Sequence, residues 1–455
     1  MTKNAYYPNE TVAAIATPPG EGGVAIVRIS GENAIAVAGR IFSKDVHTFD
    51  SHKLYFGKVI DEQGASVDEA LLVVMRGKRS YCGEDTVEIH CHGGGLISRR
   101  VLEVAFKAGA KPAKPGEFTF KAYINGKIDL AQAEAVQELI HAKNTHALDA
   151  AETHLQGRLS EKIRGFQHGL TDVAAILEAW VDFPEEGLEF ATAQEIIDLL
   201  SNVKGEMDAL HETFHDGKIA HDGLTLCLVG APNVGKSSLM NALLDKERAI
   251  VTDVPGTTRD LLEDHLRIGG LNIRLIDTAG IREASEIVEM EGIRRTRSAM
   301  SEADVILVVL DVSREVSKEE YQLISELPKD RTLVIWNKID LAETALPELS
   351  LAQVKVSAKE KRGLDRLHQE LDRLIWKEGP PSKDQVMITS LRHHHALQDA
   401  IESCNRVISG LQSEASPELV SIDMRHTLQN LGTIIGTDVT EDVLSAIFSK
   451  FCIGK

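Results

Sequence analysis

Gly230-Ala-Pro-Asn-Val-Gly-Lys-Ser237 is the stretch of sequence that decides the fold. The apolar run 224–229 before it predicts a buried strand, and the segment 238–244 after it predicts a helix. Between them, Gly230 permits a sharp turn and Gly235 lets the backbone approach a phosphate group. The spacing therefore predicts a phosphate-binding loop in an α/β module.

The residues of this loop have distinct expected roles. Lys236 is expected to reach the outer phosphates of a bound nucleotide and to act in catalysis, and Ser237 is expected to bind Mg²⁺. Backbone amides and the helix N-terminus direct positive partial charge at the ligand. The contacts expected from this loop are Asn233, Val234, Gly235, Lys236, Ser237 and Ser238.

Three further segments follow in chain order: Asp277-Thr-Ala-Gly280, Asn337-Lys-Ile-Asp340 and Ser357-Ala358. Strand-like runs precede all three, so the three segments are expected at strand ends, close to the phosphate loop. The first is expected to bind the magnesium shell and the terminal phosphate through Asp277, Thr278, Ala279 and Gly280.

The other two segments are expected to recognise the base. An ionised Asp340 carboxylate only accepts hydrogen bonds, and guanine offers two N–H donors on the facing edge, whereas adenine offers the wrong pattern. An unmatched buried polar group is costly, so ATP should be rejected. Asn337 and Lys338 belong to the same segment, and the backbone amides of Ser357 and Ala358 suit the guanine carbonyl. The four segments together predict a site for GTP.

The residues that would assist hydrolysis are less regular. Ile281 follows Gly280 at the position where Ras-like GTPases carry a glutamine that orients the attacking water. An acidic residue further on is the alternative, although such a run is also typical of a solvated helix face. The candidates are Glu283, Glu286, Glu289 and Glu291.

Charge compensation on the phosphates has several possible sources. Arg259 and Arg282 lie near the expected switch segments, but neither is an obvious arginine finger. Asn233 and the loop 252–258 offer oxygen atoms that can hold a monovalent cation beside the phosphates, and Thr258 offers a second hydroxyl for Mg²⁺.

Composition limits the class of protein. The chain has 455 residues, enough for two to four domains, and its formal net charge is −19. This sign argues against a general surface for nucleic-acid phosphates, so any nucleic-acid contact should be local. The five cysteines are scattered, which favours a reducing cytoplasm over a disulfide framework. No apolar signal core and no membrane-length apolar run is visible, so a cytoplasmic protein with no membrane contact is expected.

Pattern shifts along the chain predict a multidomain α/β protein. Residues 1–122 should form an N-terminal α+β domain, and residues 123–216 and 380–455 the two parts of a discontinuous helical domain. Residues 217–379 alternate strand and helix, which predicts an inserted, doubly wound Ras-like P-loop GTPase domain. Gly269-Gly270 within it predicts a hairpin.

Motifs outside the nucleotide segments run along nearly the whole chain. They are Thr17-Pro-Pro-Gly-Glu-Gly-Gly-Val24, Arg28-Ile-Ser-Gly31, Tyr81-Cys-Gly-Glu-Asp85, His92-Gly-Gly94, Lys114-Pro-Gly-Glu-Phe-Thr119, Lys127-Ile-Asp-Leu-Ala-Gln-Ala-Glu134, Asp182-Phe-Pro-Glu-Glu186 and Cys452-Ile-Gly-Lys455. With these motifs the chain resembles the MnmE family, also called TrmE, of tRNA-modification GTPases. The final tetrapeptide after a complete GTPase module makes the resemblance specific.

The resemblance implies two ion sites and a catalytic residue. Mg²⁺ would be bound by Ser237 and Thr258, and Glu289 would position the attacking water. Potassium would lie near the phosphates, held by Asn233, Thr252, the Val254 carbonyl and Thr257.

The resemblance also implies one-carbon chemistry in the N-terminal domain. A 5-formyltetrahydrofolate-type cofactor would bind near Arg28, Glu84, Lys127 and Lys455. Cys452, in the tail that approaches this pocket, would act in catalysis, although a small residue that packs the tail is an equally open interpretation.

The resemblance further implies partners and a reaction. The chain would form a homodimer through its N-terminal domain, and the two GTPase modules would approach each other during hydrolysis. An FAD-containing partner, MnmG (also called GidA), would join it in a heterotetramer or larger complex. That complex would bind tRNA and install a carboxymethylaminomethyl-type group at C5 of the wobble uridine. A ribosome-assembly GTPase or a signalling switch without one-carbon chemistry is the alternative.

Two histidine-rich segments allow more than one interpretation. His90-Cys91-His92 resembles a metal cluster, but a strand end that enters a glycine turn is the simpler explanation. Arg392-His-His-His395 could bind a metal or RNA, but a solvated helix face is favoured.

Overall fold

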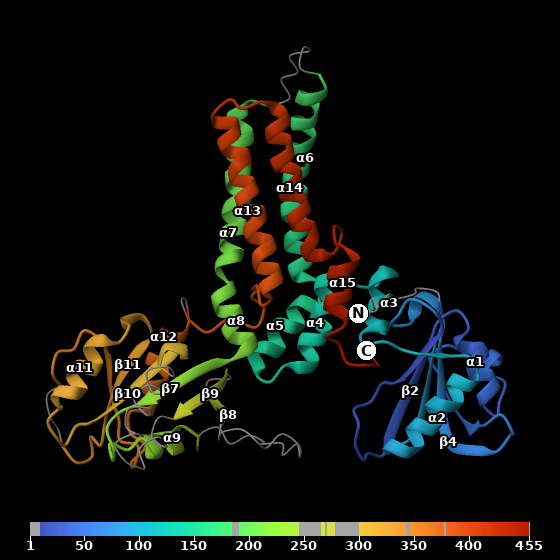
Figure 1. The fold of residues 1–455 in the computed structure, drawn as a ribbon, viewed down its shortest axis with the longest axis horizontal. Helices are drawn as coiled ribbons and strands as arrows, with labels where there is room; N and C mark the ends of the chain where they lie inside the picture. Colours follow the sequence, from blue (N-terminus) through green and yellow to red (C-terminus); the bar gives the residue numbers. More distant parts are fainter. Residues whose placement is uncertain are drawn as a thin grey trace, which may run out of the picture. The chain divides into compact units, whose positions relative to one another are not determined.

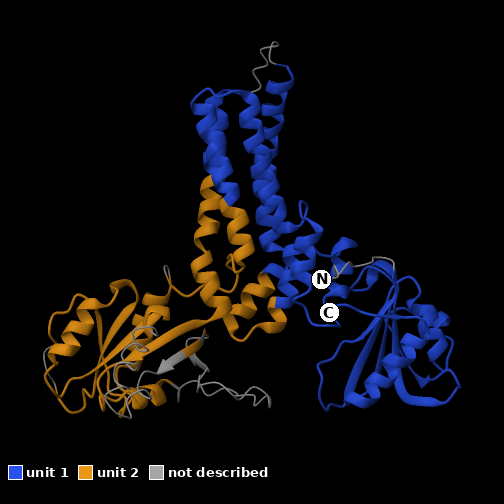
Figure 2. Cartoon of the chain, in the orientation of Figure 1, with its two compact units in different colours: residues 1–137, 154–203, 399–455 blue, residues 138–153, 204–398 orange. Residues whose placement is uncertain are grey.

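The computed structural model describes residues 10–183, 191–244, 265–268, 271–277, 300–342, 346–376 and 379–454. For residues 244, 265–268, 272 and 275–277 it describes the backbone alone. The chain divides into two compact units, coloured separately in Figure 2. The first unit comprises Met1–Gln137, His154–Val203 and Asp399–Lys455, and the second comprises Glu138–Thr153 and Lys204–Gln398. The domain boundaries expected from the sequence stay predictions.

The first unit contains a six-stranded sheet with the order β3-β4-β5-β2-β1-β6. Neighbouring strands are antiparallel except β1 and β6, which are parallel. The strands are β1 (Val12–Ile15), β2 (Val24–Ser30), β3 (Leu54–Ile60), β4 (Ser66–Met75), β5 (Thr86–His92) and β6 (Lys111–Pro112). Alternate residues of β2 are buried, as expected of a sheet with one covered face. Helices α1 (Ala34–Ile41) and α2 (Gly95–Lys107) pack against the core on that face.

Helices complete the first unit. In Figure 1, α6 (Arg158–Asp182) and α14 (Pro417–Ile435) run side by side. The buried positions of α6 are three or four residues apart, which gives the helix one apolar stripe. Near the chain end, Phe448 of α15 (Glu441–Phe448) packs beside Phe120 of α3 (Glu117–Ile124). Ile447 and Phe448 of this last helix are buried, whereas Val443 is exposed.

Four helices have residues in both units because the unit boundaries fall inside them. They are α4 (Leu130–His141), α5 (Thr145–Leu155), α7 (Ala193–Glu212) and α13 (Leu391–Gln412). Among the described residues, no helix has the length and apolar character required to span a membrane.

The second unit contains a six-stranded sheet with the order β12-β11-β10-β7-β9-β8. Its strands are β7 (Leu224–Val229), β8 (His265–Ile268), β9 (Leu271–Asp277), β10 (Val305–Asp311), β11 (Thr332–Asn337) and β12 (Ala352–Lys355). All neighbours are parallel except β8 and β9, which form the antiparallel pair expected around Gly269-Gly270. The near-continuous apolar runs of β7, β10 and β11 are those of strands covered on both faces.

Hydrophobic cores lie on both faces of this sheet. Its helices are α9 (Lys236–Leu244), α11 (Lys318–Glu326) and α12 (Leu364–Ile375), preceded by α8 (Phe214–Asp222). Because the chain enters this α/β module from α8 and leaves it toward α13, the module is inserted between helical segments. The predicted fold class is confirmed: an N-terminal α+β part, a discontinuous helical part and an inserted P-loop module.

Candidate nucleotide-binding site

The loop after β7 has the geometry of a phosphate-binding loop. A Cβ atom on Gly230 would lie 2.4 Å from the Val309 carbonyl oxygen, and one on Gly235 would lie 2.3 Å from the Asn337 side-chain nitrogen. Both glycines have positive φ angles, 151° and 94°. A side chain is therefore excluded at both positions by backbone conformation and by space. The loop passes directly into α9, whose N-terminus faces the same region.

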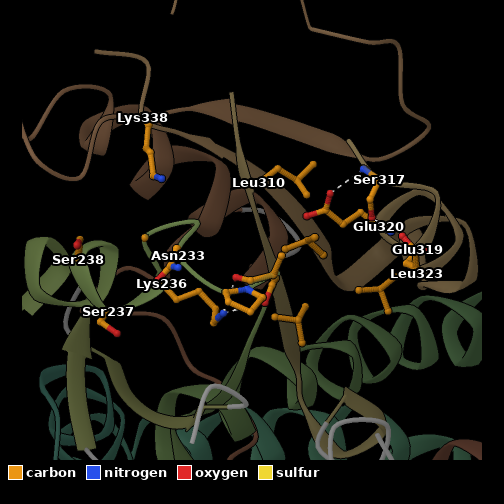
Figure 3. Close-up of a pocket in the computed structure, with 16 residues that line it drawn as sticks. Asn233, Lys236, Ser237, Ser238, Leu310, Ser317, Glu319, Glu320, Leu323 and Lys338 are labelled. Atoms are coloured by element: carbon orange, nitrogen blue, oxygen red, sulfur yellow. Dashed lines mark hydrogen bonds between the residues drawn. The ribbon is translucent and has the colours of Figure 1, made fainter. Parts of the chain in front are cut away.

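Lys236 folds back over its own loop. Its Nζ atom donates to the carbonyl oxygens of Gly230 at 2.7 Å and Ala231 at 3.0 Å. In Figure 3 the Lys236 side chain lies along its own loop, and its ammonium group contacts the loop. The two carbonyl oxygens stabilise the positive charge of the ammonium group, which would be costly to leave without a partner. A bound phosphate oxygen would compete with them for the hydrogen bonds of this group.

A cavity of about 930 Å³ adjoins the loop. The polar residues that line it include Asn233, Lys236, Ser237, Ser238 and Lys338, labelled in Figure 3. On its other side lie residues of β10 and the start of α11, including Leu310, Ser317, Glu319, Glu320 and Leu323. The volume is in the range of small-molecule pockets, and the ammonium group of Lys236 suits a phosphate group.

Asn337 joins the base-recognition segment to the phosphate loop. Its side chain is buried; Nδ2 donates to the Val234 carbonyl at 2.9 Å, and Oδ1 accepts from the Ala358 backbone amide at 3.0 Å. Three segments distant in sequence are thus held together by one amide group. This is the juxtaposition that the order of the sequence motifs predicts.

Asp340 and Ser357 are paired. The Ser357 hydroxyl donates to Asp340 Oδ1 at 2.5 Å, and this hydrogen bond holds the pKa of the Asp340 carboxyl below its usual range. The carboxylate is therefore an acceptor at neutral pH, as recognition of guanine requires. Neither side chain belongs to the cavity lining, which ends at Lys338 on this side.

The N-terminal sheet places Arg28 against the chain's tail. The Arg28 Nε atom donates to Glu88 Oε1 at 2.9 Å, Nη1 donates to the Gly454 carbonyl at 3.3 Å, and the guanidinium lies 5.4 Å from the Phe118 ring centroid. Gly454 has a φ of 99°, and a Cβ atom there would lie 2.3 Å from the Ile15 carbonyl oxygen. The tail is therefore docked through a close backbone contact that only glycine allows.

Glu84 lies over a buried cation. Its Oε1 atom accepts from Ser30 Oγ at 2.8 Å and from Lys121 Nζ at 2.6 Å. Lys121 is fully buried and also donates to the Glu10 carbonyl at 2.6 Å. Lys127 donates instead to the Lys78 carbonyl at 2.8 Å, so the structure does not pair it with Glu84 or Arg28.

Comparison with known sequences decides the family. A profile of the MnmE helical domain matches residues 130–452, and a profile of the GTP-binding protein TrmE N-terminus matches residues 11–127. The chain belongs to the MnmE family. A protein named tRNA modification GTPase MnmE from Protochlamydia amoebophila (strain UWE25) is 61% identical over 451 residues, which is 99% of this chain and 98% of that protein. The protein of the same name from Chlamydia pneumoniae is 44% identical over 457 residues, 98% of this chain and 99% of that one.

Among solved structures, the G domain of the T. maritima iron transporter FeoB is 26% identical, with a TM-score of 0.25. The match covers 34% of this chain and 99% of that domain.

Part of the MnmE-type site lies outside the described residues. For Asp277 the structure describes the backbone alone. Asp277 is the last residue of β9 and lies in register with Leu228, the residue before the last of β7. Apart from Asn233 in the phosphate loop, the side of the site expected to carry the attacking water and the potassium ion falls on residues that the structure does not describe. These are Thr252, Val254, Thr257, Thr258, Thr278, Ala279, Gly280 and Glu289, and for the folate site Lys455.

The two histidine-rich segments of this MnmE-family chain differ in burial and in partners. In β5, His92 Nδ1 lies 2.8 Å from Asp68 Oδ1, whereas Cys91 is buried in the core on the opposite face. Within the described part of the chain, no cluster of three or more potential ligands could hold a metal ion. The interpretation of residues 392–395 as a solvated face is wrong for His393, which is fully buried. Of the five cysteines, Cys452 alone is exposed, as a reactive thiol requires.

Sequence analysis missed two charged residues that pair with predicted site residues. Lys121 carries no motif signal, because its pairing with Glu84 depends on how α3 packs on the sheet. Asp311 pairs with Lys338 at 2.6 Å, and its position at the end of the apolar run 305–310 was a usable signal.

Proposed function

We propose that this chain is a GTP-hydrolysing enzyme that acts in tRNA modification. The observation that carries the proposal is the Asn337 side chain, which ties the phosphate loop at Val234 to the base-recognition segment at Ala358. Such an arrangement suits one ligand that has a triphosphate at one end and guanine at the other. The relatives that match the chain over nearly its full length carry the name tRNA modification GTPase.

Lys236 would supply the first electrostatic element of hydrolysis. When GTP binds, the Lys236 ammonium would exchange its hydrogen bonds to the Gly230 and Ala231 carbonyls for hydrogen bonds to the outer phosphates. This exchange is favourable because a phosphate oxygen is a charged acceptor and a carbonyl oxygen is a neutral one. The loop amides and the α9 N-terminus add positive potential at the same place. Phosphoryl transfer depends on positioning and charge stabilisation, which these groups provide.

Mg²⁺ and K⁺ would complete the charge balance. Ser237 lies in the first turn of α9 and lines the cavity, so its hydroxyl fits a magnesium ligand, with Thr258 as the second. Asn233 lines the cavity and has a φ of 59°, which suits a loop residue that offers its side-chain carbonyl to a potassium ion. Thr252, the Val254 carbonyl and Thr257 would complete the cage. Potassium should therefore stimulate hydrolysis, and equal rates in sodium and potassium at matched ionic strength would remove this proposal.

A one-carbon folate would bind in the N-terminal domain beside the tail. Glu84 is fixed through Oε1, and no described residue donates a hydrogen bond to its Oε2 atom, which fits an acceptor for the N–H donors of a pterin. Arg28 offers a cation for a carboxylate of the folate glutamate. Direct titration with 5-formyltetrahydrofolate tests the proposal, and Glu84→Gln should weaken binding.

Two chains would form a homodimer through the N-terminal domain. Leu54, Phe56 and Leu71 are exposed on the neighbouring strands β3 and β4, where Phe56 and Leu71 are partners in register. Adjacent exposed apolar side chains on one sheet face favour burial against another protein surface. The FAD-containing partner MnmG would then join the dimer, and the acidic chain would contact tRNA through that complex.

Mass spectrometry of tRNA nucleosides tests the proposed function. Cells that lack this chain should lose the carboxymethylaminomethyl-type group at C5 of the wobble uridine, and the wild-type gene should restore it. The Lys236→Ala variant, expressed at the same level, should fail to restore it. Unchanged wobble nucleosides in the deletion strain would exclude a role in this modification.

A further inference from the structure

Asp311 lies where the phosphate side and the base side of the site meet. It is the last residue of β10 and is in register with Asn337, the last residue of β11. The Val312 amide donates to the Asn337 carbonyl at 3.0 Å, which ties the two strand ends together. Asp311 itself is buried. A buried carboxylate at the carboxyl end of a central parallel strand is costly unless it is paired.

Both oxygens of the Asp311 carboxylate have partners. Oδ1 accepts from the Ser313 backbone amide at 2.9 Å and from the Ser313 hydroxyl at 2.6 Å, and Oδ2 accepts from Lys338 Nζ at 2.6 Å. Burial acts to raise the pKa of Asp311, but the hydrogen bonds from Lys338 and Ser313 hold that pKa below its usual range. The group is therefore a charged, fully engaged acceptor.

The loop that carries Ser313 is itself fixed. Arg314 makes a bidentate pair with Glu320, and Ser317 and Glu320 form a reciprocal capping box at the start of α11. This network holds the loop between β10 and α11 by contacts that do not involve Lys338. The orientation of the Asp311 carboxylate is consequently set by the fold before any ligand binds.

Lys338 is the more exposed member of the pair. Its side chain is 29% exposed, against 9% for that of Asp311, and it lines the cavity. The residue has a φ of 67°, a conformation that non-glycine residues seldom adopt. Without Asp311, its ammonium could hydrate in many rotamers. With Asp311, the ammonium is anchored, and the four-carbon stem is left as a flat apolar surface at the cavity wall.

We propose that Asp311 is a positioning residue that fixes the Lys338 stem against the face of the nucleotide base. The inference rests on the proposed binding of GTP and adds a residue that none of the sequence motifs contains. Asp311 touches no ligand in this scheme; it acts through Lys338 alone. A base of any identity presents a flat face, so Asp311 should contribute to affinity without contributing to the choice of base, which belongs to Asp340.

A double-mutant cycle tests the inference on the full chain with a non-hydrolysable GTP analogue in calorimetry. Asp311→Asn should weaken binding about tenfold, because the ion pair with Lys338 becomes a hydrogen bond to a neutral acceptor. In a Lys338→Met background the same substitution should change the affinity less than about twofold. An equal loss in both backgrounds would show that Asp311 is structural and would overturn the inference.

Two controls accompany the double-mutant cycle. Asp304→Asn alters a carboxylate at the opposite end of β10, where Oδ2 accepts from the Thr225 amide at 2.8 Å, and it should leave the affinity unchanged. The ratio of GTP to ITP affinity, which reports recognition of the 2-amino group, should be the same in Asp311→Asn as in the wild type. A collapsed ratio would mean that the base-recognition segment itself has moved, and this result also counts against the inference.

Failure of folding and failure of GTP binding can both be told apart from failure of the inference. If Asp311→Asn does not fold, Ser313→Ala removes one hydrogen bond to Oδ1 and should weaken GTP binding about threefold, again only when Lys338 is present. Equal weakening in the Lys338→Met background would overturn the inference. A wild-type chain that does not bind GTP would instead remove the proposed function.

Discussion

Gly235→Ala should damage nucleotide binding through Asn337. The new Cβ atom would lie 2.3 Å from the Asn337 Nδ2 atom, well inside contact distance, so the amide group must move. That movement breaks its hydrogen bonds to the Val234 carbonyl and from the Ala358 amide. The substitution also places alanine at a φ of 94°, where its Cβ crowds the backbone.

The expected loss follows from these two effects. Left-handed strain on alanine costs about 1–2 kcal/mol, and each buried neutral hydrogen bond contributes about 0.5–1.5 kcal/mol. Together they weaken GTP binding by about 2–5 kcal/mol, a factor of about 30 to 4,000 in the dissociation constant.

Calorimetry with a GTP analogue measures this loss, and thermal unfolding shows whether the chain still folds. Gly205→Ala is the matched control, because a Cβ atom on Gly205 in α7 would meet nothing within 4 Å. Its GTP affinity should equal that of the wild type. A Gly235→Ala chain that binds GTP within about threefold of the wild type would refute the proposed link through Asn337.

Three other predictions concern the rest of the site. Ser357→Ala removes the hydroxyl that donates to Asp340 and should raise the pKa of the Asp340 carboxyl. As the solution is acidified, the variant should therefore lose its preference for GTP over ATP at a higher pH than the wild type does. Superimposable pH profiles would contradict this. Glu289→Ala should slow hydrolysis in single-turnover assays and leave GTP affinity nearly intact, whereas a collapsed affinity would make the residue structural. Deletion of residues 452–455 should abolish wobble-uridine modification and spare GTP hydrolysis, and loss of both would argue against a separate tail function.

Local sequence patterns predicted the elements of the GTPase module well. The apolar run 224–229 is β7, and the strand expected before Asp277 is β9, which includes Asp277 as its last residue. These elements were predictable because the spacing of apolar residues and the glycines at turns determine local structure within a few residues. The inserted position of the module followed from the helical patterns on both sides of it.

Long-range pairings were not predictable from the same signals. Asp311 meets Lys338 because β10 and β11 are neighbours in the sheet, and Lys121 meets Glu84 because α3 packs on the N-terminal sheet. A local sequence pattern predicts neither the order of the strands in a sheet nor the place where a helix packs on that sheet. The burial of His393 was missed for a similar reason, since a polar side chain on a helix is normally solvated.

The preference of the purified chain for GTP over ATP, together with release of inorganic phosphate, tests the central claim most directly. With Mg²⁺ and K⁺ present, the wild type should bind GTP far more tightly than ATP and release phosphate, and Lys236→Ala should release almost none. Equal affinity for the two nucleotides, with no phosphate released from GTP, would contradict the account.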